Sequence, residues 1–502
     1  MMGVKTVKAK SLTRGAGVLL PISSLPSAYG IGTLGNAAFR FVDLLVELKQ
    51  KYWQILPMGP LTVGDSPFQS ISLFAGNPYY IDLDTLIEEG LLQTEEVRAY
   101  RWGDSEENVD YAVLYENRYA VLQKAFDRFD EQNEQYIAFC RKNREWLEDY
   151  SLYMAIKTDS DNEPWYTWKD ALKNRQKDAL DDCRRKLAKQ IDFWKFCQYE
   201  FYRQWNALKS YAGKRGIQMI GDMPFYVAYD SVDVWTHRKL FQLDQDGRML
   251  RVAACPPDAF SREGQIWGNP VYDWEAMEED GFDWWKARMK QQASLFDVIK
   301  VDHFLGMVKY FSLQAGETDI NAGRWLKGPG RKLADILEKA AGEKIIIAEN
   351  MGTVLPGVSK LIQKLGWPDM KILLFAFDGK ADNEYLPHNY KSTNTVVYAG
   401  THDNDTIVGY FRDRTDYELA YLYSYLNIDS KEQIPDALIR AAYSSIADVV
   451  ILQMQDILQL GNEARMNQPS TVGVNWKWRI LEDTLSEERR NWIRTQTALF
   501  RR

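Results

Sequence analysis

The segment DVIKVDHF, residues 297–304, shows the pattern that decides the fold. A short β-rich run over 297–301 ends on a carboxylate, Asp302, and His303 comes next. Val and Ile fit the pleated, half-buried surface of a strand, and a short run of them bounded by polar residues predicts one. The same form recurs upstream and downstream, so this segment is one strand of a series.

Seven further segments have strand character, and helical patterns separate several of them. Between the first two, residues 36–50 place apolar side chains at helical spacing, so the chain opens β-α-β. Alternating strands and helices indicate a parallel sheet. The eight candidates are 17–20, 52–56, 216–221, 297–301, 344–348, 370–375, 395–399 and 448–452. The last could equally belong to a buried helix, because periodicity cannot separate the two in a short apolar run.

Eight strands is the number that a (β/α)8 barrel needs. We therefore predict an α/β protein, a (β/α)8 TIM barrel with large, mostly helical insertions between strands. The stretch from about 86 to 213 is charged, aromatic and helical in pattern, too long for one crossover connection. We expect a single catalytic barrel over 1–502, with inserted subdomains at about 60–215, mostly helical, and 223–296, mostly loops.

Acidic residues stand at the ends of four predicted strands. Asp222 follows Gly221, Glu349 follows Ala348, and Asp403 lies in THDND, residues 401–405. With Asp302 they would converge on one face, because the carboxyl ends of barrel strands hold the active site. A single Asp at such a place more often caps the next helix, but four together favour a functional cluster.

Two of the four histidines lie beside these acids, His303 and His402. A metal site is the alternative, since Asp and His are both metal ligands. No HExxH motif and no close His-x-His spacing supports it. We therefore predict no metal and no organic cofactor.

Clustered carboxylates suit the cleavage of glycosidic bonds, which needs a proton donor and an anion. Glu349 ends an apolar strand, and burial raises the pKa of a carboxyl, so it is the better candidate acid. Lys300 lies two residues before Asp302, on the same strand face, and would favour its ionised form. Asp302 is then the candidate nucleophile, and Asp403 a third, supporting carboxylate.

Composition excludes several other classes. The net charge of −8 comes without a basic stripe, so nucleic acid is not an expected partner. No run of about 18 apolar residues is present to span a membrane. The basic N-terminus lacks an apolar core, which argues against a secretion signal. Four scattered cysteines without a CxxC pair suit a reducing compartment, so we expect a cytoplasmic protein.

The chain resembles a known family through short motifs in a fixed order. It is similar to the 4-α-glucanotransferases, called amylomaltases in bacteria and disproportionating enzymes in plants, glycoside hydrolase family 77. The resemblance covers nearly the whole chain. The motifs are LLPISSLPSAYGIGTLG, YWQILPMGP, GDSPFQS, FAGNP, GDMPFYVAYDSVDVW, PPDAFSREGQIWGNP, VDHF, IIAEN, AGTHDND, NQPS and NWKWR.

The resemblance implies an activity and a set of site residues. The activity is retaining cleavage of an α-1,4 bond and transfer of the glucan to the 4-hydroxyl of an acceptor. The implied substrates are malto-oligosaccharides and starch- or glycogen-derived α-glucans, and oligomeric state stays open. Asp302 would be the nucleophile, Glu349 the acid/base and Asp403 the transition-state stabiliser. Expected substrate-binding positions are Asp222, Lys300, His303, Asp378, His402, Ser66, Phe260, Gln265, Trp267 and Asn269.

The segment 223–296 would then supply loops of the substrate groove, and residues around Ala259 and Phe260 match a loop that folds over the glucan in relatives. Four positions depart from the family pattern. Lys300 and Leu305 replace Arg, Asn350 replaces an acid, and Phe68 replaces Tyr. Lys keeps the charge of Arg but loses its two-pronged hydrogen bonding, so we expect a looser hold on Asp302. Two alternatives stay open, a glucan-binding protein with reduced or lost catalysis and an enzyme that mainly hydrolyses.

Overall fold

A computed structural model describes residues 11–62, 64–258, 260–351, 355 and 357–502. Its central element is an eight-stranded parallel sheet in the order β10-β11-β12-β1-β2-β3-β6-β9. All eight predicted segments form strands, including the last, which is not helical. The strands are β1 (Gly15–Leu19), β2 (Tyr52–Gln54), β3 (Gln218–Met223), β6 (Val298–Val301), β9 (Ile345–Ala348), β10 (Asp369–Ile372), β11 (Thr395–Tyr398) and β12 (Val449–Gln453).

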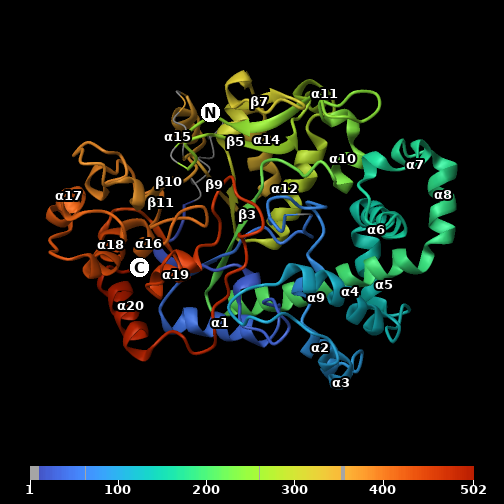
Figure 1. Ribbon diagram of the computed structural model, residues 1–502, viewed down its shortest axis with the longest axis horizontal. Helices are drawn as coiled ribbons and strands as arrows, with labels where there is room; N and C mark the ends of the chain where they lie inside the picture. The colour runs from blue at the N-terminus through green and yellow to red at the C-terminus, as the bar shows by residue number, and fades with distance from the viewer. Residues whose placement is uncertain (1–10, 63, 259, 352–354, 356) are drawn as a thin grey trace, which may run out of the picture.

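The sheet curls until its two edge strands meet, which makes a nearly closed barrel at the centre of the molecule (Figure 1). At the seam, the Ala348 N–H at the end of β9 donates to the carbonyl of Pro368, just before β10, at 3.4 Å. Apolar side chains fill the strands, and β12 is buried along its whole length. The predicted (β/α)8 barrel is therefore confirmed.

Helices cover the outside of the barrel. In α1 (Asn36–Glu47), Phe41, Val42 and Leu45 are buried, which is one face of a helix at a spacing of three to four residues. Other helices before or after strands are α12 (Asp283–Leu295), α14 (Arg331–Ala341), α15 (Val358–Leu365), α16 (Ile407–Phe411), α17 (Asp416–Leu426), α18 (Ile434–Ser444), α19 (Met454–Ile457) and α20 (Glu487–Leu499).

The connection from β10 to β11 differs from the others. Among its residues, all of which the structure describes, only two short 3-10 turns form, η6 (Leu373–Phe375) and η7 (Pro387–Asn389). The segment 373–391 therefore lies as an irregular loop at the carboxyl end of β10, beside α17.

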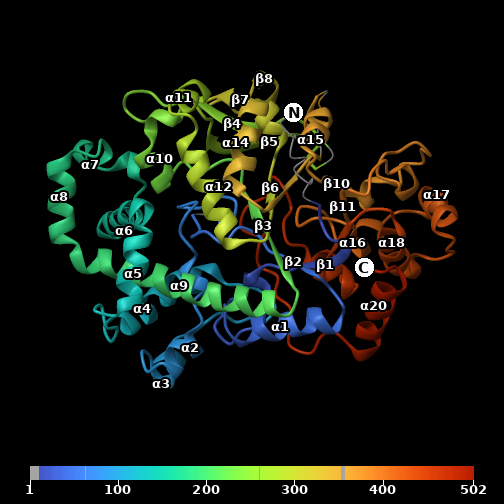
Figure 2. The ribbon, with the colours of Figure 1, turned by 180° about the vertical axis from the view of Figure 1, so that it is seen from behind.

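A helical arm connects β2 to β3 and projects to one side of the barrel (Figures 1 and 2). Its longest helix, α9, carries buried aromatic side chains along most of its 27 residues. The arm's helices are α2 (Leu83–Glu88), α3 (Thr94–Arg98), α4 (Tyr111–Phe126), α5 (Glu134–Lys142), α6 (Arg144–Asp159), α7 (Asp170–Lys173), α8 (Lys177–Lys186) and α9 (Ala188–Lys214).

A second, four-stranded antiparallel sheet lies above the barrel, in the order β5-β4-β7-β8. Strands β4 (Arg251–Cys255) and β5 (Gln265–Pro270) come from the segment after β3. Strands β7 (Lys309–Gln314) and β8 (Arg324–Lys327) come from the segment after β6. The sheet therefore joins two loops that are separate in the sequence. Short helices flank it, α10 (Val232–Thr236), α11 (Trp274–Glu279) and α13 (Leu305–Val308).

None of the helices in the described ranges has the length and apolar character needed to cross a membrane. The prediction made on the basic N-terminal stretch concerns chiefly residues 1–10, which lie outside the described residues, as does Ala259.

Candidate active site

A cleft of about 620 Å³ opens at the carboxyl ends of the barrel strands. Its walls come from the segments that follow β2, β3, β6, β9, β11 and β12, and from β5 of the smaller sheet. Ten of the predicted site residues line it. They are Ser66, Phe260, Gln265, Trp267, Asn269, Asp302, His303, Glu349, His402 and Asp403.

Three predicted residues do not line the cleft. Asp222 and Lys300 are buried near the carboxyl ends of β3 and β6, and each residue is 1% exposed. Asp378 lies in the loop after β10 with an exposed side chain, outside the cleft lining. Its predicted part in binding stays a prediction.

Strand register brings the acidic cluster together. Asp222 on β3 lies directly opposite Lys300 on β6, and Val301 lies opposite Ala348 on β9. The next residues along β6 and β9 are Asp302 and Glu349, so their carboxyls become neighbours at the same level. Adjacent parallel strands that end together thus place three acids around one lysine.

Lys300 is the only cation in this cluster, as far as the described residues extend. Its Nζ lies 2.9 and 3.1 Å from the two carboxylate oxygens of Asp222 and 3.0 Å from Oε2 of Glu349. The nearest oxygen of Asp302 is farther away, at 3.7 Å. Lys300 therefore contacts Asp222 and Glu349 more closely than Asp302, and the looser hold expected relative to Arg stays a prediction.

The carboxyls of Asp302 and Glu349 respond in opposite directions to their surroundings. Burial raises the pKa of Glu349, but Lys300, a hydrogen bond with Asp302 and the His303 N–H outweigh it and lower the pKa to about 2. Burial and the neighbouring Glu349 charge raise the pKa of Asp302 well above its ordinary value. The directions differ because Lys300 reaches across to Glu349 on β9 and lies farther from Asp302 on its own strand.

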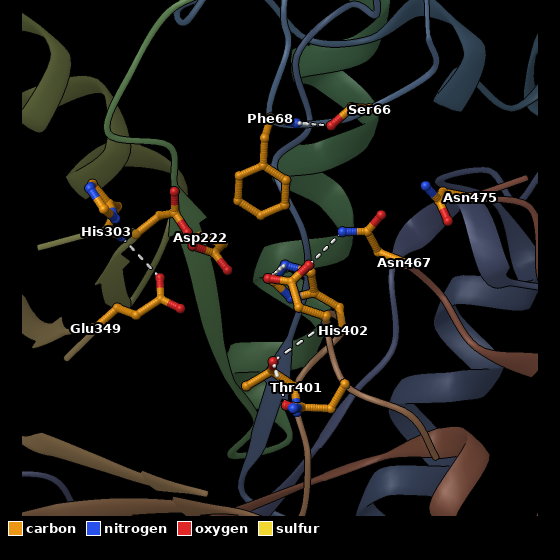
Figure 3. A network of polar contacts seen from close by, with 12 residues as sticks. Ser66, Phe68, Asp222, His303, Glu349, Thr401, His402, Asn467 and Asn475 are labelled. Carbon is orange, nitrogen blue, oxygen red and sulfur yellow. Dashed lines mark hydrogen bonds and ion pairs between the residues drawn. The ribbon is translucent and has the colours of Figure 1, made fainter. Parts of the chain in front are cut away.

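The residues around this pair are held in place by the backbone. The His303 N–H donates to Oε2 of Glu349 at 3.0 Å, and Figure 3 shows these two residues together on one side of the site. His303 has a positive φ of 45°, a conformation that costs free energy for a non-glycine residue. Burial lowers the pKa of His303 to about 4, so its ring is neutral at neutral pH.

Asp403 lies on the other side of the cleft, in a network without a lysine. Asn467 donates from Nδ2 to Oδ1 of Asp403 at 2.6 Å, and His402 Nε2 lies 3.3 Å from Oδ2 (Figure 3). Arg465 donates to the Asp403 carbonyl at 2.8 Å and also bonds the Asp405 carboxylate. The segment after β12 thus fixes the segment after β11.

Aromatic rings form the walls between these two sides. Phe68 stacks on His402, with ring centroids 5.1 Å apart and planes 17° apart. Trp476 packs against both rings, at 5.9 Å from each. On the opposite wall, Trp267 meets His303 edge-on at 4.9 Å. Flat faces of this kind suit the apolar faces of sugar rings.

The groove wall from β5 is tied to the loop after β2. Gln69 and Asn269 exchange side-chain hydrogen bonds of 2.9 and 3.0 Å. The hydroxyl of Ser66 accepts from the Phe68 N–H at 3.3 Å, which places Ser66 in the turn that presents Phe68 (Figure 3). Trp267 donates to Gln265 at 3.1 Å. These hydrogen bonds fix the side chains of β5 and of the loop after β2 without any contribution from a ligand.

Three buried polar atoms near the cleft have no partner in the described residues. They are Nε2 of His303, Nδ1 of His402 and the hydroxyl of Tyr226. A buried donor or acceptor left unpaired is costly, so each needs water or a ligand hydroxyl.

The sequence did not single out Tyr226, Asn467 or Trp476 as site residues. The quoted motifs GDMPFYVAYDSVDVW, NQPS and NWKWR contain them, so a signal was present. Asn350, which departs from the family pattern, donates from Nδ2 to the hydroxyl of Ser359 at 3.2 Å.

Within the described ranges, no three His, Cys, Asp or Glu side chains come together in a way that could hold a metal ion. The site therefore consists of carboxylates, one lysine, neutral hydrogen-bonding groups and aromatic faces. A barrel with such a cleft at its carboxyl face defines the class of barrel enzymes that act on carbohydrate chains.

Comparison with known proteins gives the family. The 4-alpha-glucanotransferase family model matches residues 20–484. A 4-alpha-glucanotransferase of Clostridium butyricum is 42% identical and is aligned over 96% of this chain and 99% of its own length. One from Thermus thermophilus is also 42% identical, over 95% and 97%. The chain belongs to the 4-alpha-glucanotransferase family.

The solved structures agree. An amylomaltase from Streptococcus agalactiae, in complex with acarbose, superimposes with a TM-score of 0.94 at 40% identity, covering 97% of this chain and 99% of that one. The fold and the family resemblance predicted from the sequence are therefore confirmed.

Proposed function

We propose that this enzyme cleaves an α-1,4 bond of a glucan with retention, through a covalent glucosyl-Asp302 intermediate. The observation that carries the proposal is that one ammonium group lies near both carboxyls, with Lys300 Nζ 3.0 Å from Oε2 of Glu349 and 3.7 Å from Oδ1 of Asp302. Retaining enzymes hold their two carboxyls about 5–5.5 Å apart, whereas inverting enzymes need about 6.5–9.5 Å to admit a water. Two carboxyls that share one ammonium group fit the shorter separation better.

The reaction has two displacements. Asp302 attacks the anomeric carbon while Glu349 gives its proton to the departing glycosidic oxygen, which leaves as the new 4-hydroxyl of the released chain. Glu349, now ionised, takes the proton of an incoming 4-hydroxyl. That oxygen then displaces Asp302 from the anomeric carbon. Two inversions give net retention, and Asp403 stabilises the positive charge that develops on the sugar in each step.

The first displacement needs a proton on Glu349 and a charge on Asp302. In the free site Lys300 lies closer to Glu349 than to Asp302 and lowers the pKa of Glu349. Binding of the sugar must therefore bring the proton to Glu349 before the first displacement.

Transfer is favoured over hydrolysis when water is kept from the intermediate. The loop after β4 and the loop after β12 meet at the cleft, and this contact supports a cover that limits the entry of water. The Ser470 hydroxyl lies 3.3 Å from that of Ser261 and 3.4 Å from the Gly264 carbonyl. Phe260 packs edge-on against Phe375 at 5.4 Å. Phe260, Gly264 and Ser470 line the same cleft as Asp302, so these contacts join separate parts of its wall.

We further propose that the chain works as one catalytic unit, with 60–215 and 223–296 as inserts. The second insert supplies Gln265, Trp267 and Asn269 to the cleft wall. We propose malto-oligosaccharides and starch- or glycogen-derived α-glucans as substrates, and the cytoplasm as the location, on the cysteine pattern.

Incubation with maltotriose tests the activity. A ladder of longer oligomers together with glucose is the expected product pattern. Glucose and maltose without longer chains would indicate a hydrolase instead. Unchanged maltotriose, with binding still measurable, would indicate a glucan-binding protein.

Two variants test the roles of the carboxyls. Asp302→Asn removes the nucleophile and Glu349→Gln the proton donor, and each should abolish the ladder. For the loss of an acid/base group we expect a rate about 10²- to 10⁴-fold lower. The measurement is initial rate of maltotriose consumption. Retained activity in either variant would refute its assigned role.

A further inference from the structure

The exposed face of helix α17 has an unusual composition. Tyr417 is 92% exposed, the largest value for a large hydrophobic side chain among the described residues. Leu419 and Leu422 form the buried face of the helix. Tyr421 lies one turn after Tyr417, so the two share a face that points away from the core.

The exposed residues at helical spacing beside these two tyrosines, Ala420 and Ser424, are uncharged. A surface helix ordinarily turns charged residues to solvent. The acids at the start of α17 are occupied elsewhere, since Glu418 bonds the hydroxyl and N–H of Thr415 in a capping box. Asp416 accepts from the Tyr423 hydroxyl at 3.1 Å. Between Tyr417 and Tyr421 the face carries only Ala420, so the ring of Tyr417 is open to solvent and that of Tyr421 is half-buried.

Aromatic contacts connect this face to the catalytic cleft. Tyr425, a further turn along α17, lies 6.2 Å from Tyr421 and 5.7 Å from Phe377 by ring centroids. Phe377 belongs to the irregular loop 373–391 after β10. Phe375 of the same loop packs against Phe260, which lines the cleft. Aromatic side chains of the loop 373–391 therefore contact the cleft lining at one place and α17 at another, and Figure 1 shows α17 at the edge of the molecule.

We propose that Tyr417 and Tyr421 form a secondary binding site for the outlying part of an α-1,4-glucan chain whose other end occupies the cleft. The proposal rests on the proposed function. A glucan is neutral, so tyrosines with the uncharged neighbours Ala420 and Ser424 suit it. Its rings present apolar C–H faces that stack on tyrosine, and the phenol hydroxyls can bond its hydroxyl groups. The helix rise places successive tyrosines about 6 Å apart along the axis, close to the size of one hexose.

Continuity with the cleft is the reason to prefer a glucan over a protein partner. A chain too long for the cleft must leave it along some surface, and the loop 373–391 contacts both the cleft lining and α17 through aromatic side chains. Short substrates would end before reaching α17. The site should therefore matter for long glucans and not for maltotriose.

The test uses the double variant Tyr417→Ala/Tyr421→Ala in the full chain. The control is Tyr115→Ala, which removes a tyrosine that is 53% exposed on α4, in the helical arm on the other side of the molecule. Binding to long-chain amylose is measured by retardation in amylose-containing native gels, and transfer is measured with maltotriose. We expect the double variant to bind amylose about tenfold more weakly, from the loss of two stacking rings. Its maltotriose rate should equal that of the wild type and of the control.

Three outcomes would overturn the proposal. The first is unchanged amylose binding by the double variant, and the second is an equal loss in Tyr115→Ala. The third is a dimeric wild type and a monomeric double variant in size-exclusion chromatography, with amylose binding intact, which would make the face a contact between copies. Thermal unfolding of each variant verifies the fold. Failure of the proposed function is distinguishable, because it appears as a missing maltotriose ladder in the wild type itself.

Discussion

The two sides of the cleft hold their carboxylates by different means. On the β6–β9 side, Asp302 and Glu349 are set by one buried cation, Lys300, shared with Asp222. On the β11 side, Asp403 is set by the amide of Asn467 and the ring of His402. The first arrangement places one positive charge among three carboxyls. The second holds a single carboxylate by hydrogen-bonding groups.

This difference matches what each side has to do. An acid and a nucleophile that share one proton need a charge nearby that can bias its position. A carboxylate that only stabilises positive charge needs a fixed place and a constant ionisation state. Variants that remove Lys300 on one side and Asn467 on the other test whether the two sides differ in this way.

Loss of Lys300 should have the largest effect. Lys300→Met leaves Asp222 and Glu349 buried without their cation, and breaking a buried ion pair costs about 3–5 kcal/mol. We expect the free energy of unfolding at neutral pH to fall by about that amount, with most activity lost. Urea unfolding measures the first. The deficit should shrink toward acidic pH, because protonated carboxyls no longer need the cation. A constant deficit across pH would contradict the electrostatic explanation.

The dependence of kcat/KM on pH in variants of Lys300 distinguishes the effect of its charge from the effect of its shape. Lys300 lowers the pKa of both Asp302 and Glu349, so its removal raises both. Residual kcat/KM of Lys300→Met should therefore peak at higher pH than in the wild type. Lys300→Arg keeps the charge and should hold or raise the rate with no such displacement. A large loss in Lys300→Arg would mean that the groove has adapted around lysine.

On the β11 side, Asn467→Ala should reduce the rate without moving the pH profile. The variant removes a hydrogen bond to a charged group, worth about 1.5–3 kcal/mol, and so about tenfold or more in kcat. The variant leaves Lys300 and its contacts with Asp302 and Glu349 in place. Profiles of kcat/KM against pH for the variant and the wild type make the comparison. A displaced acid limb in Asn467→Ala would show that the two sides are not independent.

The smallest effect is expected from Phe68→Tyr. Phe68 already stacks on His402, so the ring contact is retained and only a hydroxyl is added at the cleft surface. One new hydrogen bond to a sugar should lower KM by about threefold, with kcat nearly unchanged. Steady-state kinetics with maltotriose measures both. A change in kcat larger than that in KM would mean that the hydroxyl acts in the transition state.

Much of the barrel could be predicted because each strand carries its own signal. The apolar runs ending on Asp302 and Glu349 form strands within a residue or two of the predicted bounds. The smaller sheet was not predicted as a sheet. Its strands β4 and β7 are short, and β4 pairs with a strand about 60 residues later, so no local pattern marks the pairing. Distant partners are outside what periodicity can reveal.

The sequence indicated which residues gather at the cleft, but not which carboxylates Lys300 contacts most closely. Spacing correctly placed Lys300 near Asp302, since residues two apart share a strand face. It could not show that the long lysine side chain reaches Asp222 and Glu349 on the neighbouring strands, which depends on sheet register. The contribution of Asn467 was missed for a related reason, because the loop after β12 reaches Asp403 only in three dimensions.

The smaller sheet has a consequence for engineering the groove. Because β4 pairs with β5 on one edge and with β7 on the other, the loops after β3 and β6 form one module. A single-residue insertion in β4 would turn its side chains to the opposite face and change the register with both partners. A graft of the groove wall from a relative should therefore carry both loops together, since a single loop would arrive without its partner strand.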